Sequence, residues 1–445
     1  MLFSSLEFLY AFLPLCLLLS LLSPRRWQNL SLLLLSLLFY AYGEPVYVLL
    51  MVATITVNFS FGRLLCRKGR RRALLALAVG LNLSLLFFFK YAGMLIPTFW
   101  SIPLPIGISF YTFQAVSYLA DVYRGEVAAA RSLTDFGAYI SMFPQLIAGP
   151  IVRYSDVSER LASRPYTAER IASGTVTFVA GLSKKVLLAN GAGALADNLL
   201  ARGSTVLCAL LWLISFALQI YFDFSGYSDM AVGLGRILGF DFPENFRYPY
   251  TARSITDFWR RWHVTLSSFF REYVYIPLGG NRRGRARTYF NLLVVWALTG
   301  LWHGASLNFL LWGLYFFLLL CLEKAFLLKG LDRLPRPLGH LYALPLILFG
   351  WFIFASDGTR DTASALRLLL GNAPFLDGWV LYELKRNALL LSVLVLGATP
   401  FPRRLASRLS RRVPCLYTVL ALLGLILCTA YLASSGYNPF LYFRF

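Results

Sequence analysis

Residues 288–322 read TYFNLLVVWALTGLWHGASLNFLLWGLYFFLLLCL and contain no Asp, Glu, Lys or Arg. As a single helix rising ~1.5 Å per residue, this segment would be ~52 Å long, whereas the hydrocarbon core of a bilayer is ~30 Å thick. The segment therefore predicts membrane helices with a break between them. The small residues Gly304, Ala305 and Ser306 are the expected position of the break.

Apolar runs continue on both sides of this segment through all 445 residues. Hydrophobic residues make up 58% of the chain and charged residues 14%, and the mean hydropathy is +0.63. Soluble domains carry about a quarter charged residues. The composition therefore excludes a disordered, fibrous or ordinary cytosolic protein and indicates that lipid is the solvent.

The formal net charge is +21, from 42 basic and 21 acidic residues. These basic residues lie in short clusters between apolar runs, which is typical of topology signals and contacts with anionic lipid headgroups. We therefore expect membrane lipids as partners and no nucleic acid. The six cysteines lack a Cys-x-x-Cys motif and predict neither a disulfide framework nor a metal site.

The apolar runs predict an all-α polytopic protein with about ten transmembrane helices. The first run is interpreted as a membrane helix and not as a cleaved signal, because Arg25 and Arg26 follow it. We expect one membrane domain over 1–445, with N-terminal spans in 1–100, a catalytic core in 101–323 and C-terminal spans in 324–445. The runs are 8–22, 30–42, 46–61, 74–100, 171–188, 207–222, 289–303, 307–322, 341–354, 389–399 and 415–432.

Three basic clusters, at 25–26, 63–72 and 403–412, predict the orientation. If all three are cytoplasmic, both chain termini are extracytoplasmic. The stretches 103–125, 139–151 and 251–275 are too polar for lipid-exposed spans and too aromatic for solvated loops. We expect them to be re-entrant or interfacial helices lining a cavity.

His303 is the first candidate catalytic residue. It lies at the expected helix break beside small residues, where a substrate can approach closely. A neutral imidazole there can take a proton from an alcohol at neutral pH. The alternative is a structural histidine that is hydrogen-bonded within the helix bundle and packed by Trp302.

His263 lies in residues 257–273, where aromatic residues recur at helical spacing and predict one amphipathic helix. Arg260 and Arg261 on its polar side either anchor the helix at the interface or bind an anionic donor such as a nucleotide-linked thioester. The third histidine, His340, is interpreted as structural or interfacial.

A second polar group follows the apolar run that ends near residue 222. It contains Asp223 and Asp229, within YFDFSGYSDM over 221–230. These carboxylates either line a hydrophilic funnel or, for Asp223, cap a helix at the membrane edge.

Several ordered motifs cover the chain nearly from end to end, and with them the sequence resembles the membrane-bound O-acyltransferases. The similarity is to the bacterial branch of the alginate O-acetyltransferase. The motifs are FYAYGEP at 39–45, LPIGISFYTFQ at 104–114, FPQLIAGPIVRY at 143–154, DFSGYSDMA at 223–231, NFRYPY at 245–250, FWRRWH at 258–263, YIPLGGNR at 275–282, GLWHG at 300–304 and NPFLYFRF at 438–445.

The resemblance implies helices around a central funnel or tunnel, with His303 as the family's essential histidine and His263 as its second motif histidine. Both are candidate catalytic residues. It implies transfer of an acyl group, expected to be acetyl, from a cytoplasmic thioester such as acetyl-coenzyme A or an acyl carrier. No bound cofactor or metal is expected. Trp302, Asp223, Asp229, Arg260 and Arg261 are the candidate residues for binding donor or substrate. One departure is Ala355, where relatives often have an arginine after Trp-x-x-Phe.

The same resemblance implies a bacterial inner-membrane protein that supplies an extracytoplasmic partner of the Ser-Gly-Asn-His hydrolase type. That partner would acetylate an alginate-like exopolysaccharide or a cell-wall glycan. Two alternatives keep the chemistry: D-alanyl transfer to teichoic acid and O-acetylation of peptidoglycan. A transporter of saccharide or lipid is the alternative from another class, but no inverted repeat or pair of broken helices supports it.

Overall fold

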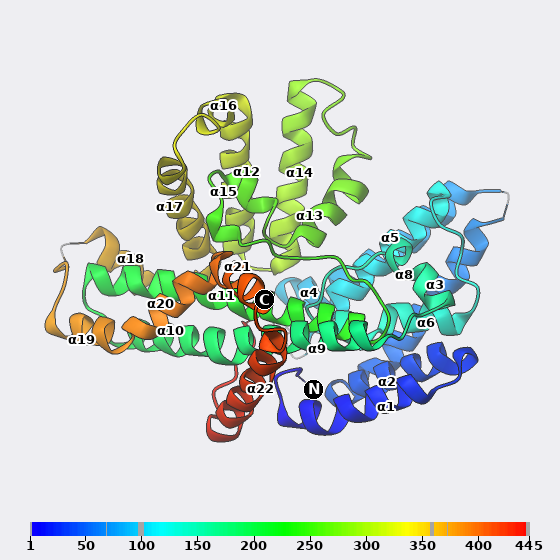
Figure 1. The fold of residues 1–445 in the computed structure, drawn as a ribbon. Helices are drawn as coiled ribbons and strands as arrows, with labels where there is room; N and C mark the ends of the chain where they lie inside the picture. Colours follow the sequence, from blue (N-terminus) through cyan, green and yellow to red (C-terminus); the bar gives the residue numbers. More distant parts are fainter. Residues whose placement is uncertain (1, 68, 97–101, 357–359, 372, 442–445) are drawn as a thin grey trace. The chain divides into compact units, whose positions relative to one another are not determined.

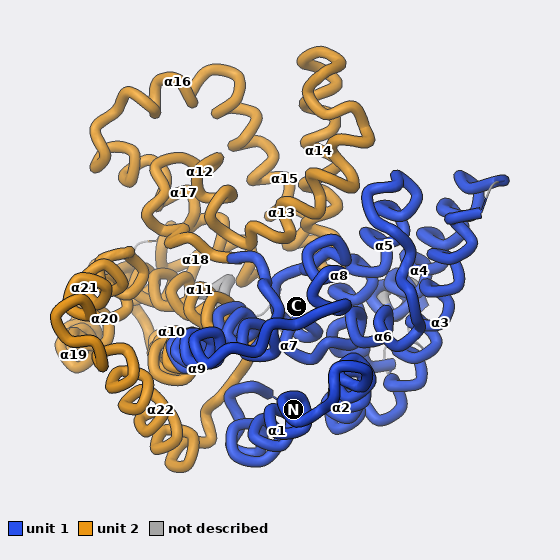
Figure 2. Tube along the Cα trace, turned by 45° about the vertical axis from the view of Figure 1, so that its right-hand side comes forward, with its two compact units in different colours: residues 1–180, 227–244 blue, residues 181–226, 245–445 orange. Residues whose placement is uncertain are grey.

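The computed structural model describes residues 2–67, 69–96, 102–356, 360–371 and 373–441, and within these ranges it contains helices and no strand (Figure 1). The all-α prediction is confirmed. The chain forms two compact units, Met1–Ala180 with Tyr227–Glu244 and Gly181–Gly226 with Asn245–Phe445 (Figure 2). These boundaries differ from the expected subdivision at 100 and 323. The expected single domain stays a prediction.

The first unit contains the N-terminal helices. They are η1 (Phe8–Phe12), α1 (Leu13–Leu22), η2 (Arg25–Trp27), α2 (Gln28–Gly43), α3 (Tyr47–Leu65), α4 (Arg71–Leu95), α5 (Ile108–Arg124), α6 (Leu133–Ser141), α7 (Phe143–Leu146), α8 (Tyr154–Ala162), most of α9 (Ala168–Ser183) and the C-terminal part of α11 (Val206–Ile237).

Buried amides join two of these apolar helices. Asn58 on α3 and Asn82 on α4 exchange two hydrogen bonds through their side-chain amides, with N···O distances of 3.1 and 2.7 Å. Each amide also donates to a carbonyl four residues earlier in its own helix. Between apolar helices such bonds stabilise one particular packing, because lipid offers no alternative partner.

The second unit contains the remaining helices. They are η4 (Lys184–Ala189), α10 (Asn190–Arg202), the N-terminal part of α11, η5 (Pro249–Thr251), α12 (Ile255–Trp259), α13 (Val264–Phe270), η6 (Arg271–Tyr275), α14 (Arg285–His303), α15 (Leu307–Leu322), η7 (Glu323–Leu327), α16 (Leu328–Leu331), α17 (Arg336–Ala355), α18 (Arg360–Leu370), α19 (Gly378–Arg386), α20 (Ala388–Gly397), α21 (Phe401–Ser410) and α22 (Leu416–Ser434).

Helices α14 and α15 pack against each other as a hairpin (Figure 1). Glycines allow the close approach. A Cβ on Gly300 would lie 2.4 Å from the carbonyl oxygen of Phe309, and one on Gly313 would lie 2.4 Å from that of Trp296. Small residues at such crossings let helix backbones meet in a membrane protein.

Seven helical runs among the described residues are long and apolar enough to cross a membrane, or eight if the bent pair α20 and α21 counts as one span. This is fewer than the ten expected from the sequence. The expected runs 8–22 and 30–42 form helices too short for this criterion, and α14 contains Arg285 and Arg287 in its first turn. The end of the expected run 74–100 lies partly outside the described residues.

The prediction of one amphipathic helix over 257–273 is wrong. The segment forms α12 and α13, which are separated by a turn at Arg260–His263. His263 has φ 44° and ψ 55°, in the left-handed region that interrupts a right-handed helix.

Candidate active site

His303 is the last residue of α14, and α15 begins at Leu307, so the predicted break at 304–306 is confirmed. Packing explains the glycine at this position. A Cβ on Gly304 would lie 2.6 Å from the ring of Phe309, so a larger residue there would displace that ring. His303 is partly exposed at the end of this hairpin.

Aromatic rings surround the imidazole of His303. The ring centroids of Trp302, Trp312 and Phe354 lie 4.9, 5.0 and 5.1 Å from it, and all three rings meet it edge-on. Trp312 is 1% exposed, and its Nε1–H has no hydrogen-bond partner among the described residues. A buried donor therefore lies beside a potential base.

A narrow cavity lies next to His303; it holds about 20 Å³, room for about one water molecule, and is partly open to the outside. Its walls come from α11, α14, α15, α17, the turn before α13 and the C-terminal segment. The lining residues are Ile220, Asp223, Phe224, Trp262, His303, Trp312, Trp351, Phe354 and Leu441. The lining is apolar and aromatic with few polar groups, which is the chemistry that the walls of small-molecule sites have.

Asp223 lies within α11 and lines the same cavity as His303, so the alternative that it caps a helix at the membrane edge is wrong. It is buried and forms an ion pair with the Nζ of Lys185 at 2.9 Å. The backbone N–H of Leu441 donates to its Oδ2 at 2.8 Å, and Lys185 also donates to the carbonyl of Pro439. The carboxylate therefore holds the C-terminal segment at the cavity.

Asp229 stands six residues further along the sequence, in the first unit, and is not among the residues lining the cavity. Its role in binding a substrate stays a prediction. The motif 438–445 is described as far as Leu441; residues 442–445 lie outside the described ranges.

His263 is 1% exposed and lies one ring away from the cavity. Its imidazole meets the ring of Phe224, a lining residue, edge-on at 4.8 Å. The ring of Trp302 lies 6.0 Å from it, so Trp302 contacts both histidines. Burial lowers the pKa of His263 to about 3, so the imidazole is neutral.

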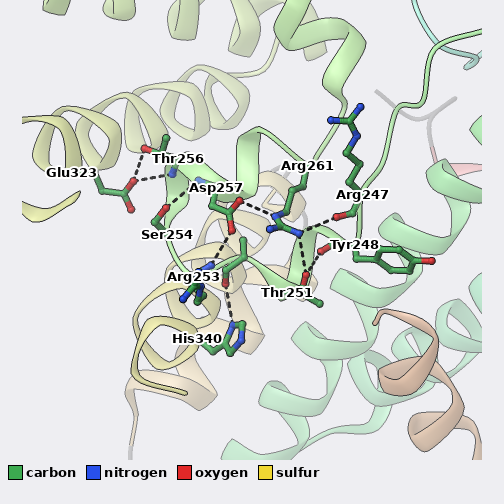
Figure 3. A network of polar contacts seen from close by, with 11 residues as sticks. Arg247, Tyr248, Thr251, Arg253, Ser254, Thr256, Asp257, Arg261, Glu323 and His340 are labelled. Atoms are coloured by element: carbon green, nitrogen blue, oxygen red, sulfur yellow. Dashed lines mark hydrogen bonds and ion pairs between the residues drawn. The ribbon is translucent and has the colours of Figure 1, made fainter. Parts of the chain in front are cut away.

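The structure separates the two candidate arginines. Arg261 donates to Asp257 at 2.8 Å and extends to the turn that carries Arg247 and Thr251, so it holds this loop together (Figure 3). Arg260 is exposed, and its guanidinium has no hydrogen bond or ion pair with the described residues. Of these two arginines, Arg260 is the one without an internal partner among the described residues; a donor-binding role for either stays a prediction.

Sequence reasoning missed Glu323, which is fully buried at the end of α15. Its carboxylate accepts the backbone N–H of Ile255 at 2.6 Å. It also accepts the backbone N–H and the hydroxyl of Thr256 at 2.8 and 2.6 Å (Figure 3). It thereby caps α12, the helix that leads to His263, from the helix that follows His303. An acidic residue directly after a long apolar run was the available signal.

His340 contacts the carbonyl oxygen of Ala252 through Nδ1 at 3.1 Å, on α17 near the same loop (Figure 3). This contact is consistent with a structural role. It leaves His303 and His263 as the two histidines near the cavity.

Comparison with known proteins gives the family. A sequence model of the membrane-bound O-acyltransferase family matches residues 87–329, more than half of the chain. A probable alginate O-acetylase AlgI of Pseudomonas putida is 36% identical over 492 aligned positions, which cover 100% of both chains. The chain belongs to the membrane-bound O-acyltransferase family.

Two further relatives show the breadth of the similarity. A peptidoglycan O-acetyltransferase of Helicobacter pylori is 34% identical over 410 positions, covering 82% of this chain and 76% of that one. A teichoic acid D-alanyltransferase of Bacillus subtilis is 28% identical over 277 positions, covering 56% and 68%. This protein is thus an O-acyltransferase and a multi-pass membrane protein.

Proposed function

We propose that this O-acyltransferase moves an acetyl group from a cytoplasmic thioester across the inner membrane for O-acetylation of an extracytoplasmic polysaccharide. The observation that carries the proposal is His303, a partly exposed imidazole at a helix end that lines an aromatic cavity. The family match and the acetylating relatives of P. putida and H. pylori support acetyl as the transferred group.

In the proposed reaction His303 is the general base. As the hydroxyl oxygen of the acceptor bonds to the thioester carbonyl carbon, the imidazole takes the hydroxyl proton. The carbon–sulfur bond then breaks, and the departing thiolate receives that proton. Trp312 Nε1–H is a donor beside His303 that can stabilise the negative carbonyl oxygen, because a preorganised donor in an apolar site acts strongly on developing charge.

The aromatic walls support acyl transfer instead of hydrolysis. Trp312, Trp351 and Phe354 leave little polar surface for ordered water next to His303. The buried charges of Asp223 and Lys185 are already paired, so they hold the cavity wall and do not compete for the acceptor's proton. We assign Asp223 a positioning role and Trp302 the packing of both histidines.

The donor is proposed to be a phosphate-bearing thioester, acetyl-coenzyme A or an acyl carrier, that contacts Arg260. An exposed guanidinium without an internal partner can bind phosphate through two parallel hydrogen bonds. The acceptor pathway is proposed to include an extracytoplasmic partner of the Ser-Gly-Asn-His hydrolase type. D-alanyl transfer is the second candidate, because the B. subtilis relative carries that name.

The first test measures ester-linked acetate on envelope and secreted polysaccharides. A strain lacking this protein is complemented with wild type, His303→Ala or the matched control His340→Ala. We expect His303→Ala to lower acetylation by about 10²- to 10⁴-fold, as loss of a general base does, and His340→Ala to retain it.

Equal membrane levels of the three proteins must be confirmed by immunoblot. Wild-type acetate in the His303→Ala strain would remove the general-base role. Unchanged acetate in the deletion strain itself would refute polysaccharide acetylation, and ester-linked D-alanine lost from the same strain would favour the second candidate.

The second test addresses the donor. Membrane vesicles containing wild type or Arg260→Ala are titrated with acetyl-coenzyme A, and Arg411→Ala, which removes an exposed charge from another segment, is the control. Loss of a charge-assisted hydrogen bond should raise the donor KM about tenfold with little change in kcat. Equal KM values for wild type, Arg260→Ala and Arg411→Ala would show that Arg260 does not bind the donor and would favour its alternative role as an interfacial anchor.

A further inference from the structure

Asn245 binds the turn at His263 through both its backbone and its side chain. Its carbonyl oxygen accepts the N–H of Val264 at 3.0 Å. Its Oδ1 contacts His263 Nδ1 at 3.1 Å and accepts the N–H and the hydroxyl of Thr265 at 3.2 and 3.0 Å. Asn245 and His263 are each 1% exposed, so water does not compete with these bonds.

These contacts determine which nitrogen of His263 carries the proton. The backbone N–H of Thr265 can only donate, so the side-chain atom it meets must be the oxygen of Asn245. An oxygen opposite His263 Nδ1 requires Nδ1–H, and a neutral imidazole then carries its lone pair on Nε2. Nε2 is buried and has no hydrogen-bond partner among the described residues.

The backbone at His263 is strained, and its hydrogen-bond partners hold it in this conformation. A non-glycine residue at φ 44°, ψ 55° is strained and persists only where its surroundings hold it. The bonds to Asn245 and the one from Ser267 N–H to the His263 carbonyl at 3.1 Å supply that support. Such strain gathers at functional sites, and a buried acceptor without a partner requires an explanation, which a bound hydroxyl donor would supply.

We propose that Asn245 is a positioning residue that holds His263 as the Nδ1–H tautomer, so that Nε2 accepts a hydrogen bond from a hydroxyl group bound beside the cavity. Two rings lie between His263 and the cavity beside His303. Phe224 contacts His263 and lines the cavity, and Trp302 contacts His263 and is adjacent to His303. The inference rests on the proposed acyl transfer, in which the attacking group is a hydroxyl.

The first measurement is independent of activity. Purified protein with ¹⁵N-labelled histidine contains three imidazoles, and loss of a signal in His263→Gln assigns the one at 263. Imidazole ¹⁵N shifts distinguish a protonated from a bare nitrogen. We expect Nδ1 protonated and Nε2 bare in wild type, and a protonated Nε2 there would overturn the proposal.

The second measurement links the tautomer to the reaction. Asn245→Leu removes the acceptor and should move the proton to Nε2 and lower acetate formation per inserted protein by roughly tenfold or more. Thr265→Val is the matched control. It removes the hydroxyl that donates to Asn245 Oδ1 but leaves the contact between Asn245 and His263, so the tautomer of His263 and the rate of acetate formation should stay near wild type. Wild-type acetate from a folded Asn245→Leu protein, or equal losses in both variants, would overturn the positioning role.

If Asn245→Leu does not fold, Asn245→Asp replaces it. A carboxylate can accept the same three hydrogen bonds but favours a doubly protonated imidazole. Acetate formation should fall if Nε2 becomes protonated and persist if Nε2 stays bare. Acetate that persists with a protonated Nε2, or falls with a bare Nε2, would refute the inference. Full acetate formation in His303→Ala would instead refute the proposed function, and the wild-type spectrum would still report on the tautomer.

Discussion

Lys185 is a charged residue inside an apolar helical run, and its side chain is 2% exposed. Its Nζ contacts Asp223 Oδ1 and Asn190 Oδ1, both at 2.9 Å, and also the carbonyl of Pro439. A buried pair of this kind need not stabilise the fold relative to apolar residues, but removing one partner leaves an uncompensated charge. Lys185 therefore determines whether Asp223 and the C-terminal segment stay at the cavity.

We predict that Lys185→Met lowers the free energy of unfolding by about 3–5 kcal/mol, because Asp223 would remain buried without its cation. Thermal unfolding of the detergent-solubilised protein measures this. The control is Arg271→Met, which removes an exposed arginine 3.8 Å from Glu272 and should cost less than about 1 kcal/mol. Equal unfolding temperatures for Lys185→Met and wild type would contradict the role of the pair.

At the scale of helices, the α14–α15 hairpin places His303. Its two helices meet where Gly300 and Gly313 approach carbonyl oxygens of the facing helix. Glu323, directly after α15, caps α12 and so links the hairpin to the segment that carries His263. The relative positions of the two histidines therefore depend on how closely α14 and α15 pack.

We predict that Gly300→Ala lowers both stability and acetate formation. Its new Cβ would lie 2.4 Å from the Phe309 carbonyl oxygen, so the helices must separate next to His303. Overpacking of this kind costs about 1–3 kcal/mol. Thermal unfolding and the acetate assay measure the two effects.

Gly80→Ala in α4 provides the control, because a Cβ there would meet nothing within 4 Å. It should be neutral or slightly stabilising, since alanine favours a helix by about 0.5–1 kcal/mol over glycine. If Gly300→Ala behaves like Gly80→Ala, close packing at Gly300 does not position His303.

The sequence predicts part of this element and misses another part. The break after His303 follows from local chain length and small residues, and α14 and α15 end and begin as expected. The turn at His263 cannot be predicted in this way, because the aromatic spacing over 257–273 fits one continuous helix. The turn that replaces that helix is bound by Asn245, whose Oδ1 contacts His263 Nδ1 from 18 residues away.

For the whole molecule, the positive-inside pattern predicts that both termini are extracytoplasmic. Two native cysteines can report on this. Cys66 follows α3 in a basic segment and Cys415 precedes α22 after another, and both are exposed. In the predicted topology both face the cytoplasm.

We expect a membrane-impermeant maleimide to label Cys66 and Cys415 only after the cell membrane is permeabilised. Ser434→Cys, at the end of α22, should react in intact spheroplasts once Cys66 and Cys415 are replaced by serine. Labelling of Cys66 or Cys415 in intact spheroplasts would reverse the predicted orientation.

The sequence by itself determined that this is an all-helical membrane protein, that the chain breaks after His303, and that it resembles its family. Apolar length, charge clusters and small residues are local properties that can be read along the chain. Only the tertiary structure decided that Asp223 pairs with Lys185 and holds Leu441, that Arg261 binds Asp257, and that His263 is held by Asn245. The partner of a buried polar group is chosen by packing, and Leu441 stands 218 residues from Asp223 in the chain.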